Sequence, residues 1–172
     1  MGDVTFHELA VATFRGAGLD VVVVVNAEVA AALPPAGPGE HRVTNPDPDQ
    51  ASGMFASVKL GVFAARGRRA SGVILLPVDH PLVTVADIEA VRARLNEGAA
   101  VVVAVHDGRR GHPIGISRAV MDEITSDPGL VTLRDVVHRD RTRVVEAAVT
   151  RGGVLGVNTP EDLDRVSNRT FR

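Results

Sequence analysis

Apolar residues follow two patterns along this chain: short continuous runs, and longer stretches in which they recur every three or four positions. The short runs are rich in β-branched residues, which is typical of strands buried on both faces. The periodic stretches are typical of helices with one apolar face. Strands or extended segments are predicted at Val21–Val25, Arg42–Thr44, Val73–Leu76, Ala99–Val105, Pro113–Ile116, Val144–Val149 and Val154–Val157. Helices are predicted at Thr5–Gly16, Ala27–Leu33, Met54–Ala65, Thr84–Gly98, Arg118–Thr125 and Thr132–His138.

Capping residues mark the start of three predicted helices. Thr5 is followed three residues later by Glu8, and Thr84 by Asp87, so that side chain and backbone can cap each other reciprocally. A further helix is predicted after Thr159, because a threonine N-cap, Pro160 at the first helical position and acidic residues in the first turn all favour a helix start.

Strands that alternate with helices predict an α/β fold with a mainly parallel sheet flanked by helices. The sequence has no internal repeat and no long linker, so residues 1–172 are expected to form a single domain.

Composition narrows the classes of function. The net charge is −2 and the chain has no tryptophan or tyrosine, which disfavours a nucleic-acid partner. The absence of cysteine excludes disulfides, thiolate catalysis and zinc–sulfur sites. No apolar run approaches the ~20 residues that a membrane helix needs, and the N-terminus lacks the pattern of a signal peptide. We therefore expect a cytoplasmic protein without a membrane partner.

Two polar residues at predicted strand ends are candidate metal ligands. Asp79 follows the buried run Val73–Leu76, and Pro81 prevents any continuation of a central strand. Asn158 follows the extended segment that ends at Val157. Open α/β sheets bind ligands at the carboxyl ends of their strands, and two oxygen donors with free positions suit Mg²⁺. The alternative for either residue is a turn or capping role without a ligand.

Histidines and glycines supply weaker signals. His106 and Asp107 end a third strand and are expected to face the same crevice as Asp79. His80, His106 and His112 lack the helical spacing of a zinc site. The tight sequence Gly111–Pro113 would let the backbone approach a ligand, or it could form a hairpin corner. No nucleophile elbow, P-loop or dinucleotide fingerprint occurs.

Four segments in register resemble the MobA/MocA-like nucleotidyltransferases. LLPVDHPL resembles the family's Asp-Gln-Pro segment after an apolar strand, with His80 in the glutamine position. Asn45-Pro46 with Gly53, Met54 and Ser57 resembles its Asn … Gly-Met … Ser stretch. Gly111-His112-Pro113 resembles its Gly-His-Pro, and the segment from Gly156 to Leu163 resembles its closing Asp-Thr-Pro-Glu-Asp-Leu.

The resemblance implies a Rossmann-like sheet and an enzyme that transfers a nucleotidyl group from CTP or GTP to a phosphorylated acceptor such as the molybdopterin cofactor, releasing pyrophosphate. It implies that Asp79 and Asn158 are the catalytic Mg²⁺ ligands. The residues implied on the nucleotide side are Asn45, Gly53, Met54, Ser57, His80 and Pro81, and those implied at the acceptor pocket are Gly111, His112 and Pro113.

The family's first strand and its glycine-rich phosphate loop have no counterpart in this sequence. That strand is central in the family, so its loss is expected to leave the Val21–Val25 and Val73–Leu76 strands without a neighbour between them. Three explanations are open: a start upstream of Met1, a sheet that closes over the gap, or a second copy that pairs there as a homo-oligomer. The missing loop also leaves open a catalytically impaired nucleotide-binding or partner-binding module. A glycosyltransferase-like enzyme is a third alternative.

Overall fold

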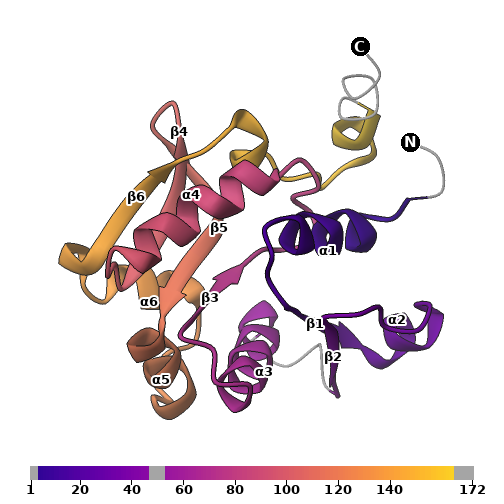
Figure 1. Ribbon diagram of the computed structural model, residues 1–172, viewed down its shortest axis with the longest axis horizontal. Coiled ribbons are helices and arrows are strands. Elements are labelled where there is room, and N and C mark those ends of the chain that lie inside the picture. The colour runs from indigo at the N-terminus through magenta and orange to yellow at the C-terminus, as the bar shows by residue number, and fades with distance from the viewer. Residues whose placement is uncertain (1–3, 47–52, 165–172) are drawn as a thin grey trace.

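The strands of the molecule lie in two separate sheets (Figure 1). The computed structural model describes residues 4–46 and 53–164. Its strands are β1 (Val21–Asn26), β2 (Glu40–Asn45), β3 (Gly72–Leu75), β4 (Val101–His106), β5 (Arg109–Ser117) and β6 (Val144–Ala148). One sheet contains β1 and β2, and the other has the order β3-β5-β4-β6.

Helices cover the strands and connect them in an α/β arrangement, as the sequence predicted. They are α1 (Phe6–Gly16), α2 (Ala27–Ala32), α3 (Met54–Gly67), α4 (Val85–Asn96), α5 (Arg118–Ser126) and α6 (Leu133–His138), with short 3-10 helices η1 (Arg141–Arg143) and η2 (Arg151–Val154). The capping boxes at Thr5 and Thr84 are both confirmed. Thr159 also caps as predicted, because its hydroxyl accepts a hydrogen bond from the backbone N–H of Asp162.

The sheet is less parallel than the sequence pattern predicted. β1 pairs parallel with β2 and β4 parallel with β6, but β5 runs antiparallel to both β3 and β4. The reason is the turn at Asp107 and Gly108, whose φ angles of 47° and 74° suit a two-residue hairpin. This turn joins β4 directly to β5, with no crossover helix between them. The extended segment predicted at Val154–Val157 is also wrong in part, because η2 includes Val154.

The expected gap between β1 and β3 is present. The two strands belong to different sheets, so the alternative in which the sheet closes over the gap is wrong. Both strands nevertheless lie between the same two helical layers. Val22 and Val73 pack into a core that includes Phe55 and Val62 of α3, whereas Val23 and Ile74 pack into a core with α1.

Two glycines test how closely the η2 segment packs. A methyl group added to Gly152 would lie 2.3 Å from the backbone oxygen of Leu82, so the two backbones would have to separate. We expect Gly152→Ala to lower the free energy of unfolding by about 2–3 kcal/mol, measured by urea denaturation. Gly67→Ala is the matched control, because no atom lies within 4 Å of the added methyl. A loss for Gly67→Ala as large as that for Gly152→Ala would contradict this prediction.

Candidate functional site

A cavity of about 1110 Å³ separates the two sheets. Its walls come from β1, from α1 and α3, and from the segment of chain that contains β3. Most of the lining is apolar, but Asp79, His80 and His112 also line it. The candidate site therefore borders the cavity that occupies the gap between β1 and β3.

Asp79 lies in the turn that follows β3, where the sequence placed it. Its side chain is 37% exposed, and its Oδ1 lies 2.9 Å from Nδ1 of His80. Its backbone carbonyl accepts a hydrogen bond of 2.7 Å from the N–H of Val157. This bond joins the turn after β3, which carries Asp79, to the segment after η2, which carries Asn158.

The side chains of Asp79 and Asn158 both border the space beside Gly156. A methyl group added to Gly156 would lie 3.0 Å from Nδ2 of Asn158 and 3.7 Å from Oδ2 of Asp79. It would also lie 3.5 Å from Cε1 of His80. The absence of a side chain at Gly156 therefore leaves a small space that a carboxylate, an amide and an imidazole all border.

His80 and His112 form an edge-to-face pair, with ring centroids 4.7 Å apart and planes at 69°. The pKa of His112 is lowered from 6.5 to about 4, mainly by burial and also by the His80 ring, while Asp79 and a hydrogen bond to the Leu75 backbone act in the opposite direction. Nδ1 of His112 is buried without a hydrogen-bond partner among the described residues. His112 is therefore a neutral imidazole near pH 7, with one acceptor nitrogen available.

The lowered pKa of His112 predicts that acid destabilises the fold. The unfolded chain takes up a proton near pH 6.5 and the folded chain only near pH 4, so stability present above pH 6.5 is lost as the pH falls toward 4. We expect this residue to account for a loss of roughly 3 kcal/mol in the free energy of unfolding across that window. Urea denaturation at several pH values measures it. In the variant His112→Gln, the free energy of unfolding should depend less on pH between 6.5 and 4. An unchanged dependence on pH would contradict the prediction.

Two of the residues implied on the nucleotide side line the same cavity as Asp79. They are Met54, which is 63% exposed, and Ser57, in addition to His80 described above. Asn45 is buried at the end of β2, and its Nδ2 donates a hydrogen bond of 3.1 Å to Oγ of Ser57. Gly53 has a φ of 48° and immediately precedes α3. Pro81 is half-buried and does not line the cavity.

Of the three residues implied at the acceptor pocket, only His112 lines the cavity. Pro113 is fully buried. A methyl group added to Gly111 would lie 2.8 Å from Cα of Val154, so this glycine permits close packing against η2. The peptide bond between His112 and Pro113 is cis.

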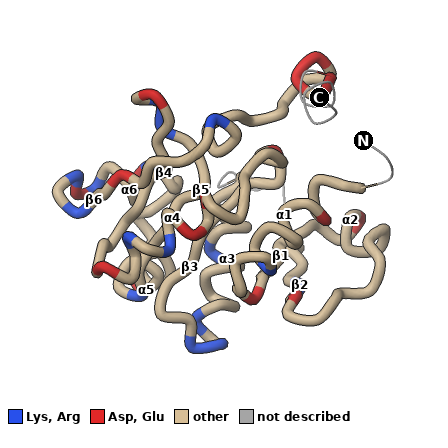
Figure 2. Tube along the Cα trace, turned by 45° about the horizontal axis from the view of Figure 1, so that its top comes forward, with Lys and Arg blue, Asp and Glu red and all other residues tan. Residues whose placement is uncertain are grey.

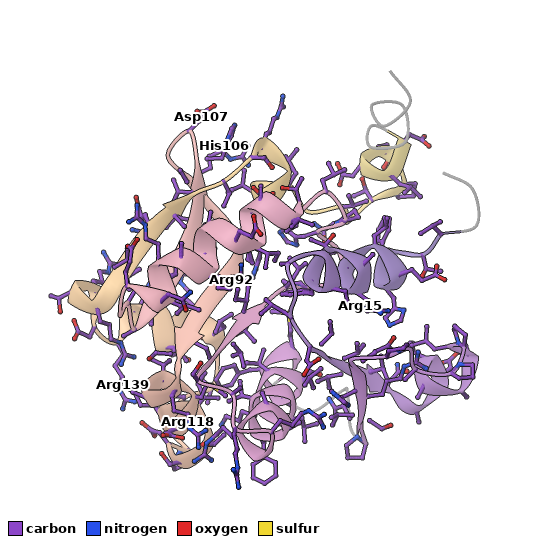
Figure 3. All side chains as sticks on the ribbon, viewed as in Figure 1. Arg15, Arg92, His106, Asp107, Arg118 and Arg139 are labelled. Atoms are coloured by element: carbon purple, nitrogen blue, oxygen red, sulfur yellow. The ribbon has the colours of Figure 1, made fainter. Side chains whose placement is uncertain are left out.

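The expectation that His106 and Asp107 share the crevice with Asp79 is wrong. Figure 3 shows both at the tip of the β4–β5 hairpin, and neither lines the cavity. Nδ1 of His106 lies 2.9 Å from the carbonyl oxygen of Val149, and the Asp107 side chain is 90% exposed. His106 is the last residue of β4 and Asp107 the first residue of the hairpin turn, so both lie at the hairpin tip, because β4 continues into β5 without a crossover.

Sequence reasoning missed two residues that shape the site. Arg92 lies on α4 (Figure 3) and lines the cavity, with its Nη1 donating 2.7 Å to the carbonyl oxygen of Ala17. Asp87 was predicted only as a helix cap, but it is buried, and its carboxylate also accepts hydrogen bonds from the backbone N–H and the hydroxyl of Thr150, at 2.7 and 2.9 Å. No local sequence signal reveals either contact, because each joins segments more than sixty residues apart.

Basic and acidic segments alternate along the trace in Figure 2, in keeping with the small net charge. Within residues 4–46 and 53–164, no helix is long and apolar enough to cross a bilayer. The same residues contain no cluster of three or more His, Asp or Glu side chains arranged to hold a metal ion. A magnesium site made of one or two protein oxygens, with phosphates and waters, needs no such cluster.

Known proteins resemble this chain in sequence and in structure. The family model of the MobA-like NTP transferase domain matches residues 1–144. The molybdenum cofactor cytidylyltransferase of Escherichia coli (strain K12) is 26% identical over 123 residues, which are 72% of this chain and 61% of that protein. The chain therefore spans less than two thirds of the length of this relative.

Solved structures share the fold over nearly the whole chain. The crystal structure of Rv0371c from Mycobacterium tuberculosis H37Rv is 26% identical, covers 98% of this chain and 86% of its own, and has a TM-score of 0.76. A complex of Rv0371C with manganese is 25% identical, covers 96% and 87%, and has a TM-score of 0.72. The 2-C-methyl-D-erythritol 4-phosphate cytidylyltransferase from Thermus thermophilus shares the fold at 20% identity, with coverage of 100% and 91% and a TM-score of 0.74. The matched segment, residues 1–144, makes up most of the chain, and the chain belongs to the family with a MobA-like NTP transferase domain.

Proposed function

We propose that this protein transfers a nucleotidyl group from CTP or GTP to a phosphorylated acceptor such as the molybdopterin cofactor and releases pyrophosphate. Membership of the MobA-like family supports nucleotidyl transfer in general. The observation that supports the specific proposal is that the Asp79 and Asn158 side chains border one space beside Gly156, and that Asp79 lines a cavity together with Ser57 and Met54.

This reaction needs neither a protein nucleophile nor a strong general base. An oxygen of the acceptor phosphate attacks the α-phosphorus of the NTP, and the bond from the α-phosphorus to the bridging oxygen of the β-phosphate breaks. Because the attacking oxygen is already anionic, the protein has to align the two partners and offset the negative charge. Asn45 holds Ser57 in place on the nucleotide side, and the neutral His112 lines the same cavity as Ser57.

The donor atoms fit a magnesium ion. Oδ1 of Asp79 is engaged by His80, whereas Oδ2 borders the space beside Gly156, where Nδ2 of Asn158 also lies. Turning the Asn158 amide by 180° would present its oxygen to this space. Carboxylate and amide oxygens are hard ligands, and Mg²⁺ commonly takes one or two of them and completes its shell with phosphates and waters. Asp79 and Asn158 would hold the ion, which would polarise the α-phosphate when bound. The manganese complex of the mycobacterial neighbour supports divalent-metal use in the family.

Pyrophosphate release tests the proposal. The protein is incubated with CTP or GTP, Mg²⁺ and molybdopterin, and pyrophosphate is followed with a coupled phosphate assay. We expect release that requires the acceptor and stops on addition of a chelator. Equal release without the acceptor, or none with either NTP, would overturn the proposal. The same assay with acceptor present, run once with CTP and once with GTP as the single nucleotide, measures the base preference.

The gap between β1 and β3 favours a second candidate, a module that binds nucleotide without turnover. Calorimetry separates the two: NTP binding without pyrophosphate release supports this module, and absence of binding contradicts it. A cytoplasmic location and association of copies through the open sheet edges stay predictions. Sedimentation velocity at several protein concentrations tests the second of these.

A further inference from the structure

We propose that His80 is a positioning residue for Asp79. Its ring holds one oxygen of the Asp79 carboxylate, so that the other oxygen is left for a divalent metal ion. This role rests on the proposed function, because the ion is the one that nucleotidyl transfer would use. Metal affinity, which needs no turnover, is its main readout.

The contact between the two side chains determines which ring nitrogen carries a proton. Nδ1 of His80 lies 2.9 Å from Oδ1 of Asp79. A carboxylate oxygen accepts hydrogen bonds and does not donate them, so the proton in this bond belongs to Nδ1. Oδ1 is thereby engaged, and Oδ2 is the oxygen that borders the space beside Gly156.

The His80 ring is held in place by its surroundings. Its side chain is 12% exposed, whereas that of Asp79 is 37% exposed. The ring packs edge-to-face against His112, with centroids 4.7 Å apart, and His112 is hydrogen-bonded to the backbone of Leu75 in β3. The donor that contacts Asp79 is therefore anchored to β3 through His112.

The backbone around Asp79 is restrained as well. The N–H of His80 donates to the carbonyl oxygen of Pro77 at 3.2 Å, and the N–H of Val157 donates to that of Asp79 at 2.7 Å. Asp79 is thus held at its carbonyl and at one carboxylate oxygen. A side chain that is oriented in advance loses little conformational freedom when it binds an ion, and this favours binding.

The arrangement suits a magnesium ligand. Mg²⁺ demands near-ideal octahedral geometry, so the direction in which the ligand oxygen points matters. Carboxylates that bind metals are commonly hydrogen-bonded by an outer partner, and loss of such a partner costs roughly 10–100-fold in metal affinity. His80 is in the position of such a partner, because it contacts Oδ1 and leaves Oδ2 beside Gly156.

Titration with Mn²⁺ tests the role directly. Free Mn²⁺ gives an electron paramagnetic resonance signal that falls on binding. We expect His80→Leu to bind Mn²⁺ about tenfold or more weakly than the unmodified chain. His106→Leu is the matched control, because Nε2 of His106 also lies near an aspartate, 3.4 Å from Oδ2 of Asp107, but outside the cavity. Its affinity should be unchanged.

Two amide variants identify the ring nitrogen that acts. The side-chain nitrogen of asparagine is as many bonds from Cα as Nδ1 of histidine, and that of glutamine as many as Nε2. We expect His80→Asn to keep most of the Mn²⁺ affinity and His80→Gln to resemble His80→Leu. The opposite order would overturn the proposal, because the acting atom would then be Nε2, which does not contact Asp79.

The Mg²⁺ dependence of pyrophosphate release separates positioning from direct contact with the substrates. For His80→Leu, the Mg²⁺ concentration that gives half the maximal rate should rise about tenfold or more. Excess Mg²⁺ should restore most of the rate. A rate that stays low at saturating Mg²⁺ would overturn the proposal, because the ring would then act on the reacting groups themselves.

The proton on Nδ1 is measured on the unmodified chain by ¹⁵N NMR of the imidazole nitrogens, and the spectrum of His80→Asn identifies the signals of His80. An Nδ1 without a proton would overturn the proposal, as would equal Mn²⁺ affinity of His80→Leu and the unmodified chain. The expected order of Mn²⁺ affinities without any pyrophosphate release would support the role of His80 and contradict only the proposed function.

Discussion

Replacing Asp79 with asparagine is expected to lower the rate of pyrophosphate release by about 10²–10³. The change keeps the shape of the side chain and an oxygen that can face His80, 2.9 Å away in the native protein. It removes the negative charge that would hold the metal ion beside the α-phosphate. The loss should fall mainly in kcat, because the charge acts on the developing transition state more than on NTP binding.

Asp107→Asn is the matched control for this change. It removes the same charge from an aspartate that is 90% exposed at the tip of the β4–β5 hairpin and does not line the cavity. We expect its rate to stay within a factor of two of the wild type. An Asp79→Asn variant that retains most of its activity would show that Asp79 is only a turn residue.

Replacing Asp87 with alanine should cause the largest loss of stability, about 3–4 kcal/mol in the free energy of unfolding. The buried carboxylate caps α4 through Thr84 and also accepts the backbone N–H and the hydroxyl of Thr150. Without the carboxylate, these donors have no acceptor in a part-buried position. The free-energy cost of an unpaired buried donor exceeds the net stabilisation that its hydrogen bond provided. Urea denaturation monitored by circular dichroism measures the loss.

Asp135→Ala provides the comparison for Asp87. Thr132 and Asp135 form the same capping box at the start of α6, but on the exposed surface and without a distant partner. We expect a clearly smaller loss of stability for Asp135→Ala. The difference between the losses of the two variants measures the contribution of the hydrogen bonds from Thr150 to Asp87. Equal losses would mean that the bonds to Thr150 add nothing beyond an ordinary cap.

Local patterns predicted most elements of this fold because their signals are local. Continuous valine runs, threonine caps and glycine stops each act within a few residues, and β1, α1 and α4 follow them closely. The direction of β5 could not be read in this way. It depends on the two-residue turn at Asp107 and Gly108, which joins β4 directly to β5. Whether the chain forms this turn or a crossover connection is decided by the pairing of β5 with β3 and β4.

The candidate site also combines residues that local sequence indicates with contacts that only the tertiary structure reveals. Asp79 and Asn158 could be proposed from sequence because each follows a predicted strand or extended segment, and strand ends gather at one edge of a sheet. Asp79 does follow β3, whereas Asn158 follows η2. The contribution of His112 as a neutral acceptor depends on burial against His80 and on its bond to Leu75, which only the tertiary structure reveals. Arg92 reaches the cavity because α4 packs beside α1, and no spacing in the sequence encodes that contact.

The interrupted sheet also affects how the molecule unfolds. A continuous sheet transmits cooperativity through its ladder, but within residues 4–46 and 53–164 β1 and β2 have no ladder to the other four strands. Their attachment to the larger part runs through helix packing, chiefly by α3, which contacts β1, β2, β3 and α5. The first part of the chain can therefore detach as a sub-global unit while the larger sheet persists, and a single two-state denaturation curve would average over two events.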